Sequence, residues 1–400
     1  MKIAVVGAGI IGMLTAYELS RRGHQVKVFD REDQPAMKCS HANGAQISVC
    51  NSQTWNTWSN VAKGLRWMLQ EDAPLLIRPS FSKAKAKWLA GFLKHTINGS
   101  HIKNTLETIK LGKASSTIYD QIIAREGLQF DQSKCGLLHV YTKEKSLVAA
   151  EGHRALFEDN GIEWRAVSRE EIIAIDPALK TFKGLQGGII TSSDWTGDAF
   201  LFCNELRKIC ERKYGVRFFF NTEVQRIKYG TLFYRTRKIP MAESFDRAII
   251  CNGHEIVNFA DEFGDDLNVY PVKGYSITIE NVGDAAPSIS LLDDDKKIVS
   301  SKLGNRLRVA GTAELDGANE DIRKERIAPL LKWVQHNFPD VSLDTYSEWA
   351  CLRPMNSNMM PIIKKSKDEH VFYHGGHGHL GWTLGAGTTR LLLDLMHLES

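Results

Sequence analysis

The chain has 400 residues, of which 43% are hydrophobic and 24% charged, and its formal net charge is +4. That composition is typical of a folded globular protein and excludes the disordered and fibrous classes, because it supplies enough apolar mass for a sizeable core. The mild charge does not require a nucleic-acid partner, and we expect none. Seven cysteines without a CxxC pair argue against a zinc ribbon or a dithiol redox motif. Unpaired thiols and the lack of an 18-residue apolar stretch predict a cytoplasmic protein without a transmembrane helix.

The first thirty residues predict a strand (2–6), a glycine-rich turn, a helix (10–22) and a second strand (25–30). The turn Gly7-Ala8-Gly9-Ile10-Ile11-Gly12 fits the G-x-G-x-x-G fingerprint of dinucleotide binding. Gly7 permits the tight turn, Gly9 lets backbone approach a pyrophosphate, and Gly12 lets helix and strand pack closely. Asp30 ends the second strand and is expected to accept the ribose hydroxyls, which disfavours NADP. FAD and NAD share this pattern, so the fingerprint alone does not separate them.

The remaining elements predict a discontinuous α/β domain with a second sheet inserted into it. Residues 55–98 read as irregular with helical patches, and 268–312 as an antiparallel sheet. The other expected elements are helices at 101–126, 144–159, 198–213 and 320–337, strands near 136–141, 216–220, 223–228, 231–235, 246–251 and 370–373, and a C-terminal helix to about residue 397.

The segment 83–97 has an apolar stripe at helical spacing, flanked by Lys83, Lys87 and Lys94. The stripe consists of Trp88, Leu89, Phe92, Leu93 and Ile97. A basic amphipathic helix of this kind fits a membrane surface. It equally fits a helix that faces the core and exposes its lysines. Both interpretations stay open from the sequence.

Two late segments favour a flavin over a nicotinamide. Residues 246–253 form an acid, an apolar strand that ends at Cys251, and Gly253, and a glycine-rich loop at 374–381 precedes the last helix. A flavin ring must be held at both ends, and a helix N-terminus stabilises negative charge on its reduced pyrimidine. His374, His377 and His379 raise a metal site as an alternative, but spacings of three and two in a glycine loop give no rigid ligand geometry, so we expect no metal. Arg353 precedes a proline and is a candidate for gripping a carboxylate.

The chain resembles the bacterial FAD-dependent D-amino-acid dehydrogenases of the D-amino-acid oxidase and glycine oxidase superfamily. The stretches that carry the resemblance span nearly the whole chain in the family's order: 7–32, 40–48, 73–78, 197–206, 270–279, 307–314, 352–355 and 376–395. The resemblance implies a two-domain α/β fold, with a Rossmann-like FAD-binding domain and an inserted antiparallel-sheet substrate domain. We expect the FAD-binding domain at 1–130, 196–262 and 352–400, and the substrate-binding domain at 131–195 and 263–351.

The resemblance also implies one non-covalent FAD per chain and oxidation of a D-amino acid to an imino acid, which water hydrolyses to a 2-oxo acid and ammonia. Electrons would pass to a quinone or another acceptor, and the protein would be cytoplasmic or peripheral on the cytoplasmic face of the inner membrane. By position, Arg353 would bind the substrate carboxylate, with Tyr275 and His379 as candidates to orient or deprotonate the amine. The residues expected at FAD are Gly7, Gly9, Ile10, Ile11, Gly12, Asp30, Arg31, Asn43, Gly44, Ala45, Gln46, Val224, Cys251, Gly253, Gly378, His379, Leu380, Gly381, Trp382 and Thr383.

Departures from the family's pattern leave alternatives open. The acid–glycine pair that usually follows L-R-P-M is replaced by residues 356–360, and Cys351 stands where glycine is usual. In the related monomeric sarcosine oxidases a cysteine near this point carries the flavin covalently, so covalent attachment at Cys351 is the alternative to non-covalent FAD. An oxidase or dehydrogenase of secondary amines, such as sarcosine, iminodiacetate or an opine, is the alternative function.

Overall fold

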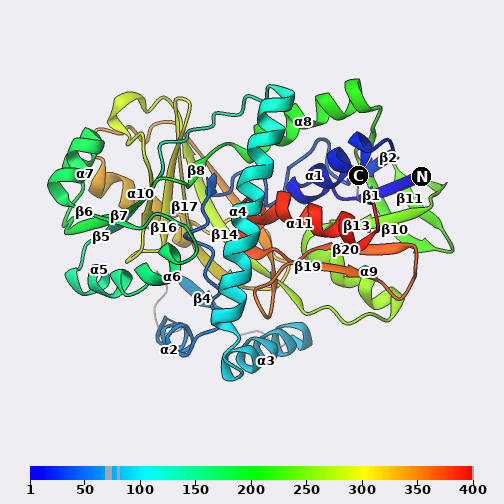
Figure 1. Cartoon of the computed structure of the whole chain (residues 1–400), viewed down its shortest axis with the longest axis horizontal. Helices are drawn as coiled ribbons and strands as arrows, with labels where there is room; N and C mark the ends of the chain where they lie inside the picture. The colour runs from blue at the N-terminus through cyan, green and yellow to red at the C-terminus, as the bar shows by residue number, and fades with distance from the viewer. Residues whose placement is uncertain (68–73, 79–81, 399–400) are drawn as a thin grey trace.

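The computed structural model describes residues 1–67, 74–78 and 82–398. Parts of the segment 55–98, and residue 73 of the stretch 73–78, therefore lie outside the described residues. Two large sheets lie in opposite halves of the molecule, and the long helix α4 (His101–Glu126) runs between them (Figure 1). This is the mixed α/β, two-domain architecture that the sequence predicts.

One half is built on a six-stranded sheet in the order β19-β20-β13-β1-β2-β9. All neighbouring pairs are parallel except β19 with β20. The strands are β1 (Lys2–Val6), β2 (Gln25–Phe29), β9 (Arg217–Phe219), β13 (Arg247–Ile250), β19 (Ile362–Lys365) and β20 (Val371–Gly375). Helices α1 (Ile10–Arg21), α8 (Ala199–Tyr214) and α11 (Gly381–Leu395) pack against one another, and α4 packs on α11. Their apolar faces and the sheet enclose one buried core.

The other half is built on a nine-stranded sheet in the order β18-β14-β17-β16-β15-β5-β7-β6, with β4 beside β17. The strands are β4 (Leu75–Ile77), β5 (Leu137–Tyr141), β6 (Arg165–Ser168), β7 (Gly187–Thr191), β14 (Val269–Ile279), β15 (Ser290–Asp293), β16 (Ile298–Leu303), β17 (Arg306–Leu315) and β18 (Tyr346–Asn356). The sheet is mostly antiparallel, but β15 pairs with β5, and β17 with β4, in parallel. Helix α10 (Lys324–Asn337) covers β14 and β17 and encloses a second core.

The smaller elements complete the description. Strands β10 (Thr222–Lys228), β11 (Thr231–Thr236) and β12 (Ile239–Ser244) form a three-stranded sheet, and β3 (Gln46–Ile47) pairs with β8 (Trp195–Thr196). The remaining helices are α2 (Trp58–Trp67), α3 (Lys83–Ile97), α5 (Glu144–Glu151), α6 (Arg154–Glu158), α7 (Arg169–Ile175) and α9 (Ile256–Phe263). Short 3-10 turns occupy η1 (Pro177–Thr181), η2 (Gly253–Glu255), η3 (Gly283–Ala285) and η4 (Gly378–Leu380).

Several elements differ from the sequence prediction, among them β6, α7, β7, α9, β18 and β19, which were not predicted, and three of the differences have a local explanation. The helix expected at 144–159 is two helices, because the chain breaks at Gly152. The helix expected from 320 begins at Lys324, since the Asn319 side chain accepts a hydrogen bond from the Asp321 N–H at 2.7 Å and holds a local turn instead. Strand β12 was not predicted; it carries Pro240 and lies at a sheet edge, where a missing N–H is tolerated.

Candidate active site

A single cavity of about 1640 Å³ runs between the two halves of the molecule. It begins at the β1–α1 turn and the end of β2, passes the loop before β3, and reaches the N-terminus of α11 and the face of β14 and β18. Ligand pockets for ordinary small molecules occupy roughly 300–1,000 Å³. This cavity is therefore large enough for a dinucleotide together with a second, smaller molecule.

The β1–α1 turn forms one end of the cavity, and each of its three glycines is needed for a different physical reason. Gly7 has φ +103°, and a Cβ there would lie 2.7 Å from the Cys251 carbonyl oxygen. A Cβ on Gly12 would lie 1.9 Å from the Gly7 oxygen, so Gly12 serves packing and does not line the cavity. A Cβ on Gly9 would meet only Ser40 Oγ, at 3.6 Å. The space beside the Gly9 α-carbon is therefore open toward the cavity, which Gly9 lines.

Asp30 lies at the end of β2, where the cavity also touches Val224. Its carboxylate accepts hydrogen bonds from the N–H of Ala8 at 2.5 Å and of Glu32 at 2.9 Å. Burial raises the pKa of this carboxyl above its usual range, while the two N–H donors oppose that rise. Each oxygen keeps a lone pair for a further donor such as a ribose hydroxyl. Arg31 lines the same end, and its guanidinium forms an ion pair with Glu255 at 2.7 Å.

The loop before β3 lies along the nine-stranded sheet. The side chain of Asn43 accepts a hydrogen bond from the Ala45 N–H at 2.9 Å, and Ala45 has φ +61°. A Cβ on Gly44 would stand 2.7 Å from Val299 Cγ2. Gln46 donates to Ser290 Oγ at 2.9 Å and to the Leu291 oxygen at 3.0 Å. These contacts fix the loop so that its backbone lines the cavity.

The C-terminal glycine loop places the N-terminus of α11 on the cavity. Leu380, Gly381, Trp382 and Thr383 all line it. Gly378 has φ +60°, and a Cβ there would lie 2.5 Å from Met355 Sδ. His374 bonds Thr15 and Thr388 through its two ring nitrogens, and His377 also bonds Thr388. Burial lowers the pKa of both histidines, so these rings are neutral partners of threonine hydroxyls.

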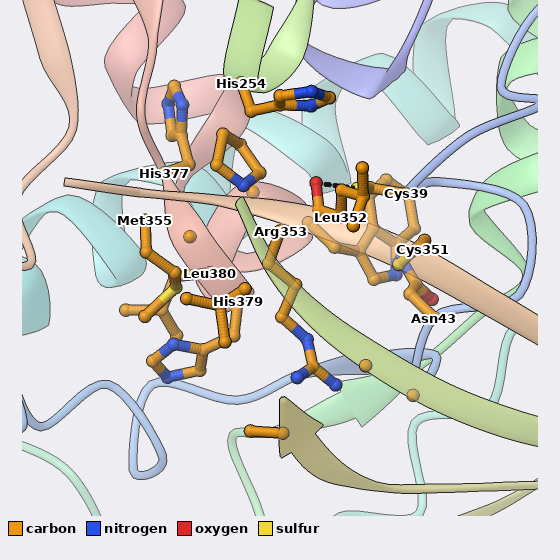
Figure 2. Close-up of a pocket in the computed structure, with 18 of the residues that line it drawn as sticks. Cys39, Asn43, His254, Cys351, Leu352, Arg353, Met355, His377, His379 and Leu380 are labelled. Atoms are coloured by element: carbon orange, nitrogen blue, oxygen red, sulfur yellow. Dashed lines mark hydrogen bonds between the residues drawn. The ribbon is translucent and has the colours of Figure 1, made fainter. Parts of the chain in front are cut away.

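Arg353 projects from β18 into the cavity (Figure 2). Its guanidinium lies over Gly274 of β14, since a Cβ on Gly274 would be 2.2 Å from Arg353 Cζ. Its Nη1 donates to the Thr312 carbonyl oxygen at 3.3 Å. Thr312 is the extra residue of a β-bulge between β14 and β17 and has φ +58°, a strained conformation for a β-branched residue. The strained carbonyl and the bare α-carbon together define where the guanidinium sits.

His379 lies on the opposite side of the Arg353 side chain from Cys39 and Cys351 (Figure 2). Its ring stacks on Trp55, with ring centroids 4.6 Å apart. Burial, and secondarily the charge of Arg353, lower the pKa of His379 to about 3. The imidazole is therefore neutral at physiological pH.

Tyr275 lines the cavity, but its hydroxyl is engaged away from it. The hydroxyl donates to Glu314 Oε2 at 2.5 Å, and that buried carboxylate also pairs with Arg78 at 3.0 Å and Arg323 at 3.3 Å. Burial, together with the hydrogen bond to Glu314, raises the pKa of Tyr275 far above its usual value. Its catalytic role stays a prediction, and the geometry gives its hydroxyl a structural partner.

The structure thus brings the predicted site residues to one cavity, with Gly12 behind its wall. The residues of the site that were not predicted include Gly274, Thr312, Cys39 and Trp55. A glycine inside the strand pattern 270–279 was a signal for a close approach. Nothing in the sequence marks Thr312 as a bulge residue.

Comparison with known proteins identifies the family. A protein-family profile described as FAD dependent oxidoreductase matches residues 2–395. The chain belongs to this family. A protein of Mesorhizobium japonicum named D-amino acid dehydrogenase 3 is 43% identical to it, covering 99% of this chain and 97% of that protein. A D-amino acid dehydrogenase of Azorhizobium caulinodans is 33% identical, covering 99% and 96%. The solved structure of glycine oxidase from Bacillus cereus superposes with a TM-score of 0.77 at 16% identity, covering 99% and 94%, and so shares the fold.

The cofactor of this FAD-dependent oxidoreductase is FAD, and the cavity fits it. Gly9 leaves space at the N-terminus of α1, where free N–H groups and the helix dipole favour a pyrophosphate. Asp30 keeps acceptor capacity beside that space. The N-terminus of α11 meets the same cavity at its other end. The chain would therefore hold FAD through the β1–α1 turn, the loop 43–46 and the start of α11.

Proposed function

We propose that this protein is an FAD-dependent D-amino acid dehydrogenase, which oxidises a D-amino acid to an imino acid that water hydrolyses to a 2-oxo acid and ammonia. The observation that carries the proposal is the 43% identity to a D-amino acid dehydrogenase over 99% of this chain, and the cavity-facing Arg353, a residue type suited to binding a carboxylate, supports it. FAD, when bound, supplies the acceptor for the hydride that leaves the substrate Cα.

Arg353 is the proposed carboxylate-binding residue. Its planar guanidinium presents two parallel N–H groups, which match a carboxylate. One Nη already donates to the Thr312 oxygen, so the rotation of the group is restricted before substrate binds. Such positioning is the main contribution that this chain makes to the chemical step, because a well-oriented reacting pair lowers the barrier by roughly 7–11 kcal/mol.

His379 is the proposed orienting residue for the amine. It is a neutral imidazole beside Arg353 and is held flat by Trp55. A neutral ring nitrogen accepts a hydrogen bond from a substrate amine. Because its pKa is about 3, His379 is a weak base, so the amine must enter in its uncharged form. Tyr275 would act through Glu314 and the β14–β17 bulge and would not take a proton itself.

Two further parts of the proposal concern the electron acceptor and the membrane. We assign a quinone or a similar small molecule as acceptor.

Among the helices that the structure describes, none is long and apolar enough to cross a bilayer. Helix α3 supports a peripheral contact: Trp88 and Phe92 pack inward, while Leu89, Leu93 and Ile97 are 37%, 41% and 63% exposed. Lys83 and Lys94 lie on the same helix and would meet anionic lipid, whereas Lys87 forms an ion pair with Asp266 at 2.5 Å.

The domain boundaries complete the proposal. The segments 1–130, 196–262 and 352–400 would hold FAD, and 131–195 with 263–351 would shape the substrate site. The six-stranded and nine-stranded sheets broadly follow this division. Strand β4 and residues 352–356 of β18, which the prediction assigns to the FAD-binding segments, join the nine-stranded sheet, so both parts of the chain contribute to the cavity.

The decisive experiment is anaerobic bleaching of the bound flavin with matched D-amino acids, L-amino acids and N-alkyl glycines. We expect D-amino acids to bleach the flavin and L-enantiomers to leave it yellow. Bleaching by N-alkyl glycines alone, with oxygen uptake when air is admitted, would assign the secondary-amine alternative instead.

A further inference from the structure

Cys351 faces the cavity beside Arg353. Both residues belong to β18, and side chains two positions apart in a strand lie on the same face. Cys351 pairs with Gly274 across the β14–β18 ladder, and Gly274 is the residue over which the Arg353 guanidinium lies. The Cys351 thiol is therefore part of the wall that positions Arg353.

Cys39 approaches Cys351 from the loop between β2 and β3. Its sulfur lies 2.8 Å from the carbonyl oxygen of Leu352, the residue between Cys351 and Arg353 (Figure 2). The Cys39 and Cys351 thiols are also hydrogen-bonding neighbours, so the single S–H proton of Cys39 is shared between the Leu352 oxygen and the Cys351 sulfur. Both cysteines are partly exposed as residues and line the cavity, so the cavity is the route by which a small oxidant would approach them.

The surroundings of the pair favour a thiolate at Cys351. The hydrogen bond from Cys39, assisted by the charge of Arg353, lowers the pKa of Cys351, whereas the pKa of Cys39 is raised. By contrast, burial raises the pKa of Cys203, Cys210 and Cys251. A thiolate next to a protonated thiol is the arrangement in which oxidation of one sulfur is resolved by the other.

We propose that Cys39 and Cys351 form a redox-sensitive dithiol that closes to a disulfide when the enzyme meets hydrogen peroxide. In the first step the Cys351 sulfur attacks one peroxide oxygen, the O–O bond breaks, and sulfenic acid and water form. In the second step the Cys39 sulfur attacks the sulfenic sulfur, an S–S bond forms, and a second water leaves. In sum, two thiols lose two electrons and two protons, and one peroxide is reduced to two waters.

Closure has a consequence for the substrate site. The two sulfurs must approach to about 2.05 Å, which draws β18 and the loop around Cys39 together. Arg353 is two residues from Cys351, and a displacement of about 1 Å at a positioning residue costs roughly a hundredfold in rate. We therefore expect the oxidised enzyme to show a higher KM for its carboxylate substrate, with FAD retained.

The test uses the FAD-loaded enzyme, treated with a few equivalents of hydrogen peroxide and then freed of it. The denatured protein should show five reactive thiols in place of the seven cysteines of the untreated chain. Peptide mapping should link the peptide containing Cys39 to the one containing Cys351, and dithiothreitol should restore all thiols and the original KM. Seven thiols after treatment, or a disulfide between other cysteines, would overturn the proposal.

Three variants sharpen the result. Cys39→Ser removes the resolving thiol, so treated enzyme should carry a sulfenic acid at Cys351 that dimedone traps, and no disulfide. Cys351→Ser should show neither. Cys135→Ser, at an exposed cysteine away from the cavity lining, should form the Cys39–Cys351 disulfide as the wild type does. The mapping of wild-type enzyme decides the matter even where a variant folds poorly.

Discussion

The guanidinium of Arg353 rests on the α-carbon of Gly274, so closely that a Cβ on Gly274 would lie within 2.2–2.5 Å of three guanidinium atoms. Register brings them together, because Gly274 pairs with Cys351 and Val272 with Arg353 on neighbouring strands. A strand glycine normally weakens a sheet. Here its missing side chain is the space in which the proposed carboxylate-binding group lies.

Gly274→Ala should therefore act as a substrate-binding mutation. The new methyl displaces Arg353, and we expect KM for a D-amino acid to rise by about tenfold or more. Steady-state kinetics and flavin reduction measure it. Gly188→Ala in β7 is the matched control, since its Cβ would stand 2.6 Å from the His139 oxygen of the neighbouring strand β5, away from Arg353. Equal KM values in the two variants would remove Gly274 from the site.

Arg353→Ala should raise KM strongly and slow flavin reduction, because the carboxylate loses a bidentate partner. Loss of such a charge-assisted pair costs about 1.5–3 kcal/mol, or roughly 10- to 150-fold in binding. Arg353→Lys should restore only part of this, since an ammonium cannot present a planar fork. Rapid-mixing measurement of flavin reduction separates binding from chemistry. An unchanged reductive half-reaction in Arg353→Ala would place carboxylate binding elsewhere.

FAD occupancy should distinguish Gly9 from Gly12. Gly9→Val should give a folded but colourless protein, because its branches enter the cavity without a clash against the chain. Gly12→Val should lower stability even without cofactor, as its Cβ collides with Gly7. Asp30→Ala should weaken flavin binding by removing the carboxylate at the end of β2. Absorbance at the flavin band and thermal unfolding of the cofactor-free protein report the two effects; full occupancy in Gly9→Val would contradict the assignment.

The pH dependence of flavin reduction should follow the substrate amine. The pKa of His379 is about 3, and that of Tyr275 is raised far above its usual value, so neither changes protonation between pH 6 and pH 9. The rate should rise with pH as the amine loses its proton, with no limb from a histidine near its ordinary value of about 6.5. His379→Asn should lower the rate and keep the shape of this profile. A bell-shaped profile with a limb near pH 6.5 would show that another base acts.

Membrane contact should depend on the outward face of α3. Vesicles with anionic lipid should bind the protein at low salt and release it as salt screens the lysines. Replacing Ile97, which is exposed and lies outside the cavity lining, by serine should weaken binding without loss of FAD. The control replaces Arg235, Arg237 and Lys238, exposed on the β11–β12 hairpin, by glutamate. Equal sedimentation of all forms with and without vesicles would exclude this surface.

The sequence by itself determined the elements whose signals are local. The β1–α1–β2 unit follows from apolar runs and three glycines within a few residues, and helices 83–97 and 101–126 appear at their predicted bounds. Hydrophobic periodicity and turn chemistry act over a few residues, so both are readable without a fold. The glycine fingerprint, Asp30 and the N-terminus of α11 could be predicted as parts of the site because each is marked by a local sequence pattern.

Only the tertiary structure decided which distant residues meet. Arg353 over Gly274, Tyr275 on Glu314, and Cys39 against Cys351 all depend on strand register and on a loop that crosses between sheets. The tertiary structure also separates the apolar stripe of helix 83–97 into a buried and an exposed part. The indole N–H of Trp88 donates to the Met355 oxygen at 2.7 Å, whereas Ile97 is exposed. Such juxtapositions are set by packing between segments that lie tens to hundreds of residues apart in the sequence, and no local pattern encodes a packing partner.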